Sequence, residues 1–85
     1  MEESVEESVG KRIRRARMWR GVGQAELARA IGLSKTSLSL IETGQVQDPR
    51  SSIIQKIAKE LRVRPDFILG FTDDMESEYE AAAVA

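Results

Sequence analysis

The sequence predicts a small all-α domain of five helices. Along most of the chain, apolar residues recur at intervals of three and four, which is the spacing of one face of a helix. Glycine and proline divide these periodic runs into segments of helical length, and no run alternates apolar and polar residues as a strand would. Because 41% of the 85 residues are hydrophobic, the chain can build one core.

The positions of these glycine and proline residues set the bounds of the predicted helices. The helices span residues 9–20, 24–31, 35–43, 51–61 and a shorter run that begins at Pro65. Ser34 can cap the third helix by accepting a hydrogen bond from an unpaired amide, and Gly44 can end it in the left-handed conformation. Pro65 suits a first turn because its missing amide would be unpaired there anyway. The residues expected in the core are Ile13, Val22, Leu27, Ile31, Leu38, Ile41, Ile54, Ile57, Leu61 and Leu69.

The second and third predicted helices form the most informative feature of the chain. Gly32 ends the second helix and Ser34 opens the third, so the connection is about three residues long, as in a helix-turn-helix. In such a unit, the second helix projects its first turn into a groove of DNA. The spacing of the apolar residues therefore predicts a DNA-docking device.

Charge is strongly segregated along the chain, although its formal net charge is only −1. Residues 9–72 hold all 13 basic residues and five acidic ones, a balance of +8 that suits phosphate binding. Residues 1–8 form an acidic N-terminal tail. Residues 73–85 form either an acidic C-terminal tail or an added dimerisation helix over 74–84. The acidic flanks either solubilise the chain or compete with DNA for the basic domain.

Composition argues against several functional classes. The chain has no cysteine and no histidine, and it contains no phosphate loop, nucleophile elbow or metal-ligand cluster. We therefore expect no enzymatic activity, no cofactor and no metal. The acidic N-terminus lacks the features of a secretory signal, and no stretch has the length of a membrane span, so we expect a cytoplasmic protein without membrane contact.

Punctuating residues also stand at fixed spacings between positions 10 and 70. They are Gly10-Lys-Arg-Ile-Arg, Arg17, Gly21-Val-Gly-Gln-Ala-Glu-Leu-Ala, Gly32-Leu-Ser, Ile41-Glu-Thr-Gly, Asp48-Pro, Ile57-Ala-Lys-Glu-Leu and Asp66-Phe-Ile-Leu-Gly70. In these motifs and their spacing, the chain resembles the Cro and phage-repressor type of helix-turn-helix protein, also called the xenobiotic-response-element family. The resemblance implies a five-helix lambda-repressor-like DNA-binding domain whose partner is double-stranded DNA.

The resemblance also implies which residues read base sequence. The base-reading positions of the family correspond to Lys35, Thr36 and Leu40, and Ser37 either contributes or only approaches the backbone. Lys35 can donate to guanine, and Thr36 can donate or place its methyl on thymine. Leu40 departs from the family, which usually has a polar residue there. Leu40 therefore either contacts a thymine methyl or packs on protein.

Other polar residues are expected to contact the DNA backbone. Gln24 opens the second helix, where unpaired amides and the helix dipole favour a phosphate. Gly23 replaces the usual capping residue just before it, so this cap is expected to be weak. The remaining backbone or minor-groove candidates are Ser39, Gln45, Gln47 and Arg50.

The resemblance further implies a structural ion pair between Arg17 and Glu42, which braces the first helix against the end of the third. It also implies a homodimer, because one recognition helix offers few base contacts and two half-sites lie about one helical turn apart. The dimer candidates are Phe67, Ile68, Phe71, Met75 and Tyr79.

Two functions follow from the sequence. The first is a sequence-specific transcriptional regulator, most often a dimeric repressor that occupies an inverted-repeat operator. The alternative is an antitoxin-like or other protein-interaction module that uses the same fold and binds a protein partner through its acidic C-terminal segment.

Overall fold

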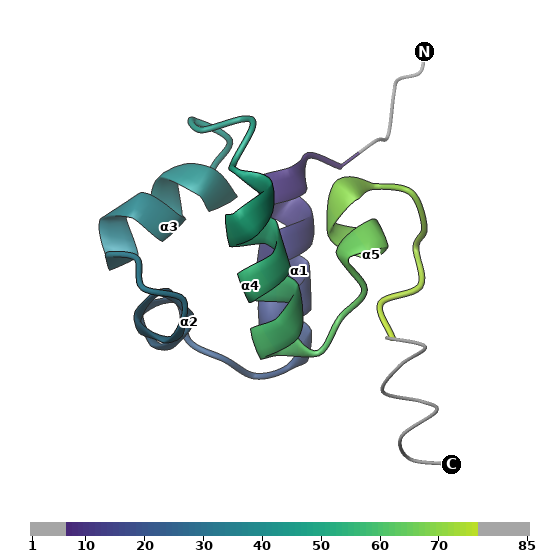
Figure 1. The fold of residues 1–85 in the computed structure, drawn as a ribbon, viewed down its shortest axis with the longest axis horizontal. Helices are drawn as coiled ribbons and strands as arrows, with labels where there is room; N and C mark the ends of the chain where they lie inside the picture. Colours follow the sequence, from purple (N-terminus) through teal and green to yellow (C-terminus); the bar gives the residue numbers. More distant parts are fainter. Residues whose placement is uncertain (1–6, 77–85) are drawn as a thin grey trace.

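A computed structural model describes residues 7–76 and contains five helices there (Figure 1). The helices are α1 (Val9–Trp19), α2 (Gln24–Ala30), α3 (Lys35–Glu42), α4 (Ser51–Leu61) and α5 (Pro65–Leu69). Each begins at the residue predicted from the sequence, and the first four end within one residue of the predicted position. The five-helix, all-α fold is therefore confirmed. None of the described helices is long and apolar enough to cross a membrane.

Local side-chain chemistry explains where these helices begin and end. The Ser34 hydroxyl accepts a hydrogen bond from the backbone amide of Ser37 at 3.0 Å, which is the cap expected for α3. Gly44 has a φ of +89° just beyond the C-terminus of α3. At the N-terminus of α2, Gly23 has no side chain to accept from a first-turn amide, and the Glu26 carboxylate accepts from the separate amide of Gly23 at 3.3 Å.

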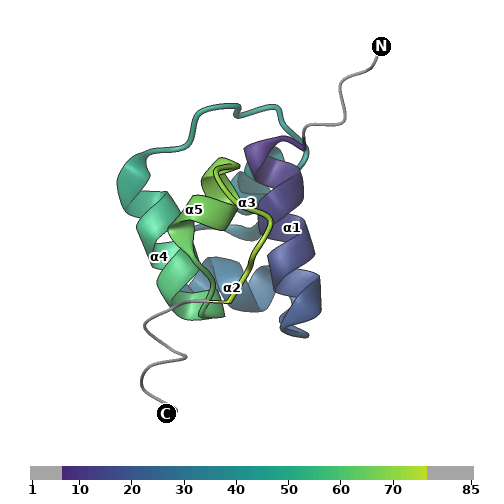
Figure 2. The ribbon, with the colours of Figure 1, turned by 90° about the vertical axis from the view of Figure 1, so that its right-hand side faces the viewer.

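The helices surround one core, with α2 and α3 on one side and α5 on the other (Figures 1 and 2). α1 contacts α3, α4 and α5, and so joins the two sides. The core is made of the following buried apolar residues, which include eight of the ten that were predicted: Ile13, Ala16, Leu27, Ala28, Ile31, Leu38, Ile41, Ile54, Ile57, Ala58, Leu61, Val63, Phe67 and Ile68. Val22 is partly buried and packs against this core.

The structure corrects two expectations for α5. Leu69 was expected in the core but is 47% exposed, because α5 has only five residues and turns Phe67 and Ile68 inward instead. Phe67 and Ile68 were expected at a dimer interface, yet both are 0% exposed and belong to the core of the single chain. Of the candidates on α5 and its flank, only Phe71 is largely exposed.

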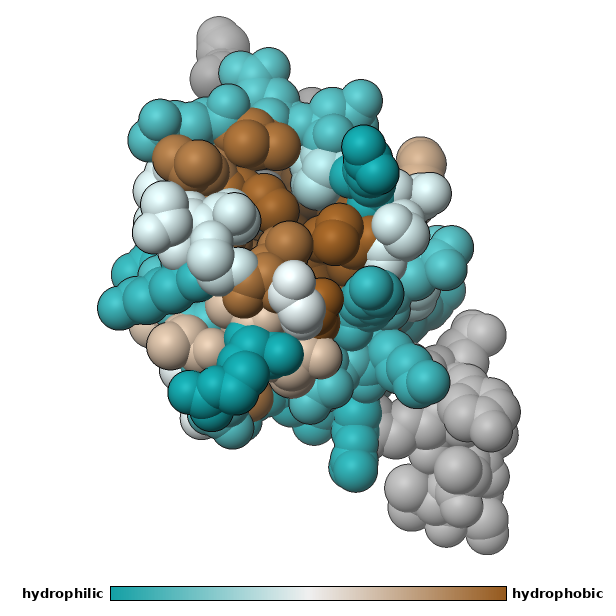
Figure 3. Space-filling model, turned by 60° about the vertical axis from the view of Figure 1, so that its left-hand side comes forward, coloured by the Kyte–Doolittle hydropathy of each residue, from teal (hydrophilic) through white to brown (hydrophobic). Residues whose placement is uncertain are grey.

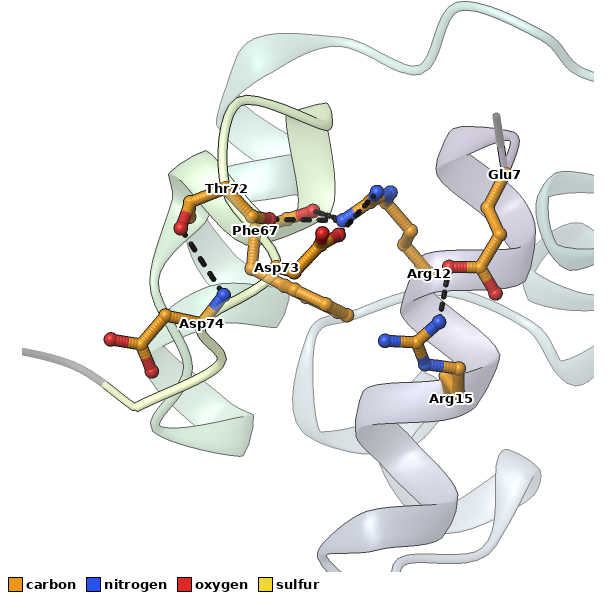
Figure 4. Close-up of polar contacts among 7 residues, drawn as sticks. All are labelled: Glu7, Arg12, Arg15, Phe67, Thr72, Asp73 and Asp74. Carbon is orange, nitrogen blue, oxygen red and sulfur yellow. Dashed lines mark hydrogen bonds and ion pairs between the residues drawn. The ribbon is translucent and has the colours of Figure 1, made fainter. Parts of the chain in front are cut away.

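A buried arginine ties α1 to the C-terminal end of the domain (Figure 4). The guanidinium of Arg12 lies 4.9 Å from the centroid of the Phe67 ring, and its Nη1 donates to the carbonyls of Phe67 and Thr72, each at 3.0 Å. Its Nη2 bonds the Asp73 carboxylate at 3.1 Å. Because these acceptors follow or belong to α5, Arg12 holds the segment after α5 against α1.

The packed domain extends beyond the predicted boundary at residue 72. The Arg64 amide donates to the Met75 carbonyl at 3.0 Å, and Val63 and Glu76 form an isolated antiparallel bridge. Met75 also packs against the core, so its side chain is not freely available for a partner. Residues 74–76 are not helical, and the rest of the expected 74–84 helix, with Tyr79, lies outside the described residues.

Candidate nucleic-acid interface

α2 and α3 form a compact helix-turn-helix unit. Gly32 has a φ of +79° at the turn, and the amide of Leu33 donates to the carbonyl of Ala28 at 2.8 Å. α3 turns Leu38 and Ile41 into the core, where both are buried. The opposite side of α3 is therefore held outward on a packed frame.

The predicted base-reading residues lie on this outward side. Lys35 and Thr36 are exposed at the first turn of α3, and neither side chain has a bonding partner within residues 7–76. Ser37 is half-buried, and its hydroxyl lies 2.9 Å from that of Ser34. Leu40 is half-buried one turn further along the helix. The arrangement leaves two unengaged polar side chains and one partly exposed apolar side chain on the same helix.

The backbone-contact candidates surround α3, but they are not equally free. The loop between α3 and α4 carries three exposed candidates, Gln45, Gln47 and Arg50. Arg50 occupies the N-cap position of α4, but its side chain makes no capping hydrogen bond. Ser39 is half-buried in α3, where its carbonyl accepts from the amide and the hydroxyl of Thr43, both at 2.9 Å. The loop side chains are thus more accessible than Ser39.

An ion pair fixes the end of α3 against α1. The Arg17 Nε donates to Glu42 Oε2 at 2.9 Å, and its Nη2 donates to Glu42 Oε1 at 3.0 Å. The remaining Nη1 donates to the Val22 carbonyl at 3.0 Å. The Glu42 side chain is only 2% exposed. A two-pronged contact of this kind restrains both distance and orientation, so it positions the last turn of α3.

Gln24 is part of the same network. Its Nε2 donates to Glu42 Oε1 at 3.1 Å, which sequence reasoning did not anticipate. A glutamine amide carries two N–H groups, so a second donor remains on the half-buried side chain. The bond to Glu42 therefore orients Gln24 at the N-terminus of α2 without using up its capacity to donate.

A family model described as Helix-turn-helix matches residues 13–68, from within α1 to within α5. The chain belongs to this family. This match confirms the resemblance to Cro and phage-repressor proteins that the sequence motifs indicated. The matched residues include α2 and α3, which form the helix-turn-helix unit.

Solved structures of this fold class are similar as well. The N-terminal DNA binding domain of SinR from Bacillus subtilis is 31% identical, with a TM-score of 0.67 over 72% of this chain and 88% of that domain. The P22 c2 repressor in complex with synthetic operator 9T is 27% identical, with a TM-score of 0.66 over 73% of this chain and 92% of that one. The SinR protein/SinI protein complex contains a chain that is 28% identical, with a TM-score of 0.70 over 89% of this chain and 75% of that one.

Proposed function

We propose that the chain is a cytoplasmic, sequence-specific, double-stranded DNA-binding transcription regulator. It acts as a dimeric repressor on an inverted-repeat operator, with α3 in the major groove. The observation that carries the proposal is the outward side of α3, where Lys35 and Thr36 have no partner among the described residues. Similarity to a SinR DNA binding domain and to a P22 c2 repressor solved with an operator supports it.

The chemistry of this side of α3 assigns a role to each residue. Lys35 donates to guanine O6 or N7, and Thr36 bonds a base edge or packs its methyl on thymine. Leu40 offers an apolar contact to a thymine methyl. Ser37 is already within bonding distance of Ser34, so it contributes less than Lys35 or Thr36.

Phosphate contacts hold α3 in register. Gln24 directs its second N–H to a phosphate beside the N-terminus of α2, and Gln45, Gln47 and Arg50 contact the backbone from the loop that follows α3. Ser39 makes a weaker contact. Because these contacts release counterions, affinity falls as salt concentration rises.

The decisive test is selection of bound duplexes from a random library at about 0.1 M salt, followed by sequencing. The expected result is an inverted repeat with half-site centres about 10 base pairs apart. A folded chain that enriches no sequence would overturn sequence-specific binding.

Lys35→Ala is expected to relax selection at one position in each half-site. The cost on the preferred operator is about 1–3 kcal/mol, which is the discrimination of a good side-chain to base contact. Lys59→Ala is the matched control, because Lys59 is an exposed lysine on α4. Repeating the selection with both variants checks the prediction. An unchanged operator logo for Lys35→Ala would remove this residue from base reading.

Gln24→Ala is expected to weaken DNA binding about tenfold irrespective of sequence, because a hydrogen bond to a charged group contributes about 1.5 kcal/mol or more. Fluorescence anisotropy with labelled duplexes of different sequence measures the loss. The control is Gln55→Ala, which changes an exposed glutamine of α4. Equal affinities of the two variants would contradict the phosphate contact.

The SinR protein/SinI protein complex favours a second candidate, a protein-interaction module that uses the same fold. In this chain such a partner would bind through the acidic residues that follow the domain. An affinity pull-down with the full chain and with a chain ending at Glu76 separates the two functions. Loss of a partner from the shorter chain, with DNA selection unchanged, would support this second role.

A further inference from the structure

An apolar hollow lies between α3, the loop that follows it and the first turn of α4. Figure 3 brings forward the side on which α3 lies in Figure 1, and it shows apolar residues gathered in the centre and ringed by hydrophilic ones. The apolar lining of the hollow consists of Leu33, Leu40, Ile41, Val46, Pro49 and Ile53.

Two side chains of this lining are held in place without being fully buried. The Val46 amide donates to the Leu40 carbonyl at 3.0 Å, which holds the loop against the end of α3. The Val46 side chain is nevertheless 40% exposed, and Leu40 is half-buried. A ligand that covers these two side chains therefore removes apolar surface from water without first having to order the loop.

Leu40 joins the hollow to the proposed base-reading surface. It lines the hollow, and it stands four residues after Thr36, so that the two side chains are neighbours on the surface of α3. With α3 in the major groove, base edges that contact Thr36 continue over Leu40 towards Val46. The hollow therefore faces base edges in the proposed complex.

One group on those base edges matches an apolar hollow. The major groove presents ring nitrogens, carbonyl oxygens and amino groups, which are polar, and the C5-methyl group of thymine, which is not. A polar group would lose hydrogen bonds to water in the hollow, whereas a methyl group gains from leaving water. The hollow has a volume of about 490 Å³, so the pyrimidine edge that carries the methyl group also fits.

We propose that Val46 and Leu40 form a socket for the C5-methyl group of a pyrimidine, which makes Val46 a further specificity-determining residue. The inference rests on the proposed function, because it specifies what one part of that DNA interface reads. The socket distinguishes thymine from unmethylated cytosine. It accepts 5-methylcytosine in place of thymine, because both bases carry the methyl group on the same ring atom.

The charged residues of the hollow favour a base edge over a phosphate. Asp48 and Arg50 both line it, and neither forms an ion pair within residues 7–76. The Asp48 carboxylate repels a phosphate, which keeps the DNA backbone out of the hollow. The guanidinium of Arg50 is exposed and attracts the backbone beside it.

The first test compares thymine with uracil, which differ only in the methyl group. Each thymine of the operator selected by the full chain is replaced in turn by deoxyuridine, and fluorescence anisotropy measures the affinity. At the thymine that the socket reads, the replacement is expected to weaken binding about fourfold for each half-site, which is the effect of one methyl group removed from apolar burial.

Two variants assign this methyl effect to the hollow. Val46→Ala lacks the two methyl groups of valine, and it is expected to bind the thymine and uracil duplexes within about twofold of each other. Leu40→Ala removes the other side of the socket and is expected to behave in the same way. Met18→Ala is the matched control, because Met18 is a 58% exposed apolar residue of α1, and it is expected to keep the wild-type ratio. Circular dichroism checks that all three variants are folded.

The second test adds the methyl group to a different base. The thymine that the socket reads is replaced by cytosine, paired with guanine, and the duplex is compared with one that carries 5-methylcytosine there. Methylation is expected to raise the affinity of wild type and of Met18→Ala about fourfold, and to change that of Val46→Ala much less.

The outcomes separate the socket from the proposed function. An operator that wild type binds equally well with thymine and with uracil at every position would overturn the socket and leave sequence-specific binding intact. A methyl effect of the same size in Val46→Ala, Leu40→Ala and Met18→Ala would also overturn the socket, because another part of the chain would then read the methyl group. A folded chain that selects no operator would overturn both proposals.

Discussion

Glu42→Ala is expected to leave a large fraction of the molecules unfolded at ordinary temperature. The substitution leaves the Arg17 guanidinium, whose side chain is 12% exposed, without the carboxylate that accepts two of its hydrogen bonds. It also removes the acceptor of Gln24. Stranding one partner of a buried ion pair costs about 3–5 kcal/mol. Because domains of this size seldom exceed about 3–5 kcal/mol of stability, this loss removes nearly all of it.

Thermal and urea unfolding followed by circular dichroism measures the effect. Glu60→Ala is the control, because Glu60 is an exposed acidic residue of α4 that forms no ion pair among the described residues. Its melting temperature is expected to stay close to that of wild type. If Glu42→Ala had the same melting temperature as the Glu60→Ala control, the ion pair would contribute little to stability.

Gly10→Ala is expected to be the second severe substitution, although alanine normally stabilises a helix relative to glycine by about 1 kcal/mol. A Cβ at this position of α1 would lie 2.1 Å from the carbonyl oxygen of Ile41 and 2.7 Å from that of Glu42. Both atoms are backbone, so no side-chain rotation relieves the overlap. α1 and α3 must move apart, at a cost of about 3 kcal/mol or somewhat more.

The control for this substitution is Gly23→Ala. A Cβ on Gly23 would find nothing closer than atoms of Glu26 at 4.0 Å, and its φ of −74° suits an alanine. Urea unfolding is expected to separate the two variants clearly, because Gly23→Ala costs no more than about 1 kcal/mol, the difference between glycine and alanine at an N-cap. If Gly10→Ala matched the stability of Gly23→Ala, the close approach of α1 to α3 would not be needed for folding.

Much of the fold follows from local sequence signals. Ser34, Gly44 and Pro65 act at the termini of their helices, and each does so through its own backbone or side chain. Such signals need no knowledge of the tertiary structure, so the helix boundaries were predictable. The outward position of Lys35 and Thr36 follows in the same way, because the inward turn of Leu38 and Ile41 fixes the other side of the helix.

Contacts between distant segments were not predictable in this way. Arg12 was counted among the basic residues of a phosphate-binding surface, yet it is 8% exposed and bonds residues that lie 55 to 61 positions away. Phe67 and Ile68 were assigned to a dimer surface because the family resemblance implies an interface at the fifth helix and its flanks, and a short apolar run does not show by itself which side chains are buried within one chain. The link from Gln24 to Glu42 likewise depends on how α2 and α3 pack.

Arg12 also has a consequence for the order in which the chain is made. The arginine lies in α1, but two of its acceptors, Thr72 and Asp73, are synthesised 60 and 61 residues later. Until they emerge, its guanidinium must stay hydrated, which opposes closure of α1 over the core. Folding of the domain therefore waits for almost the whole of its described length, and an unfinished chain remains open to proteases and chaperones.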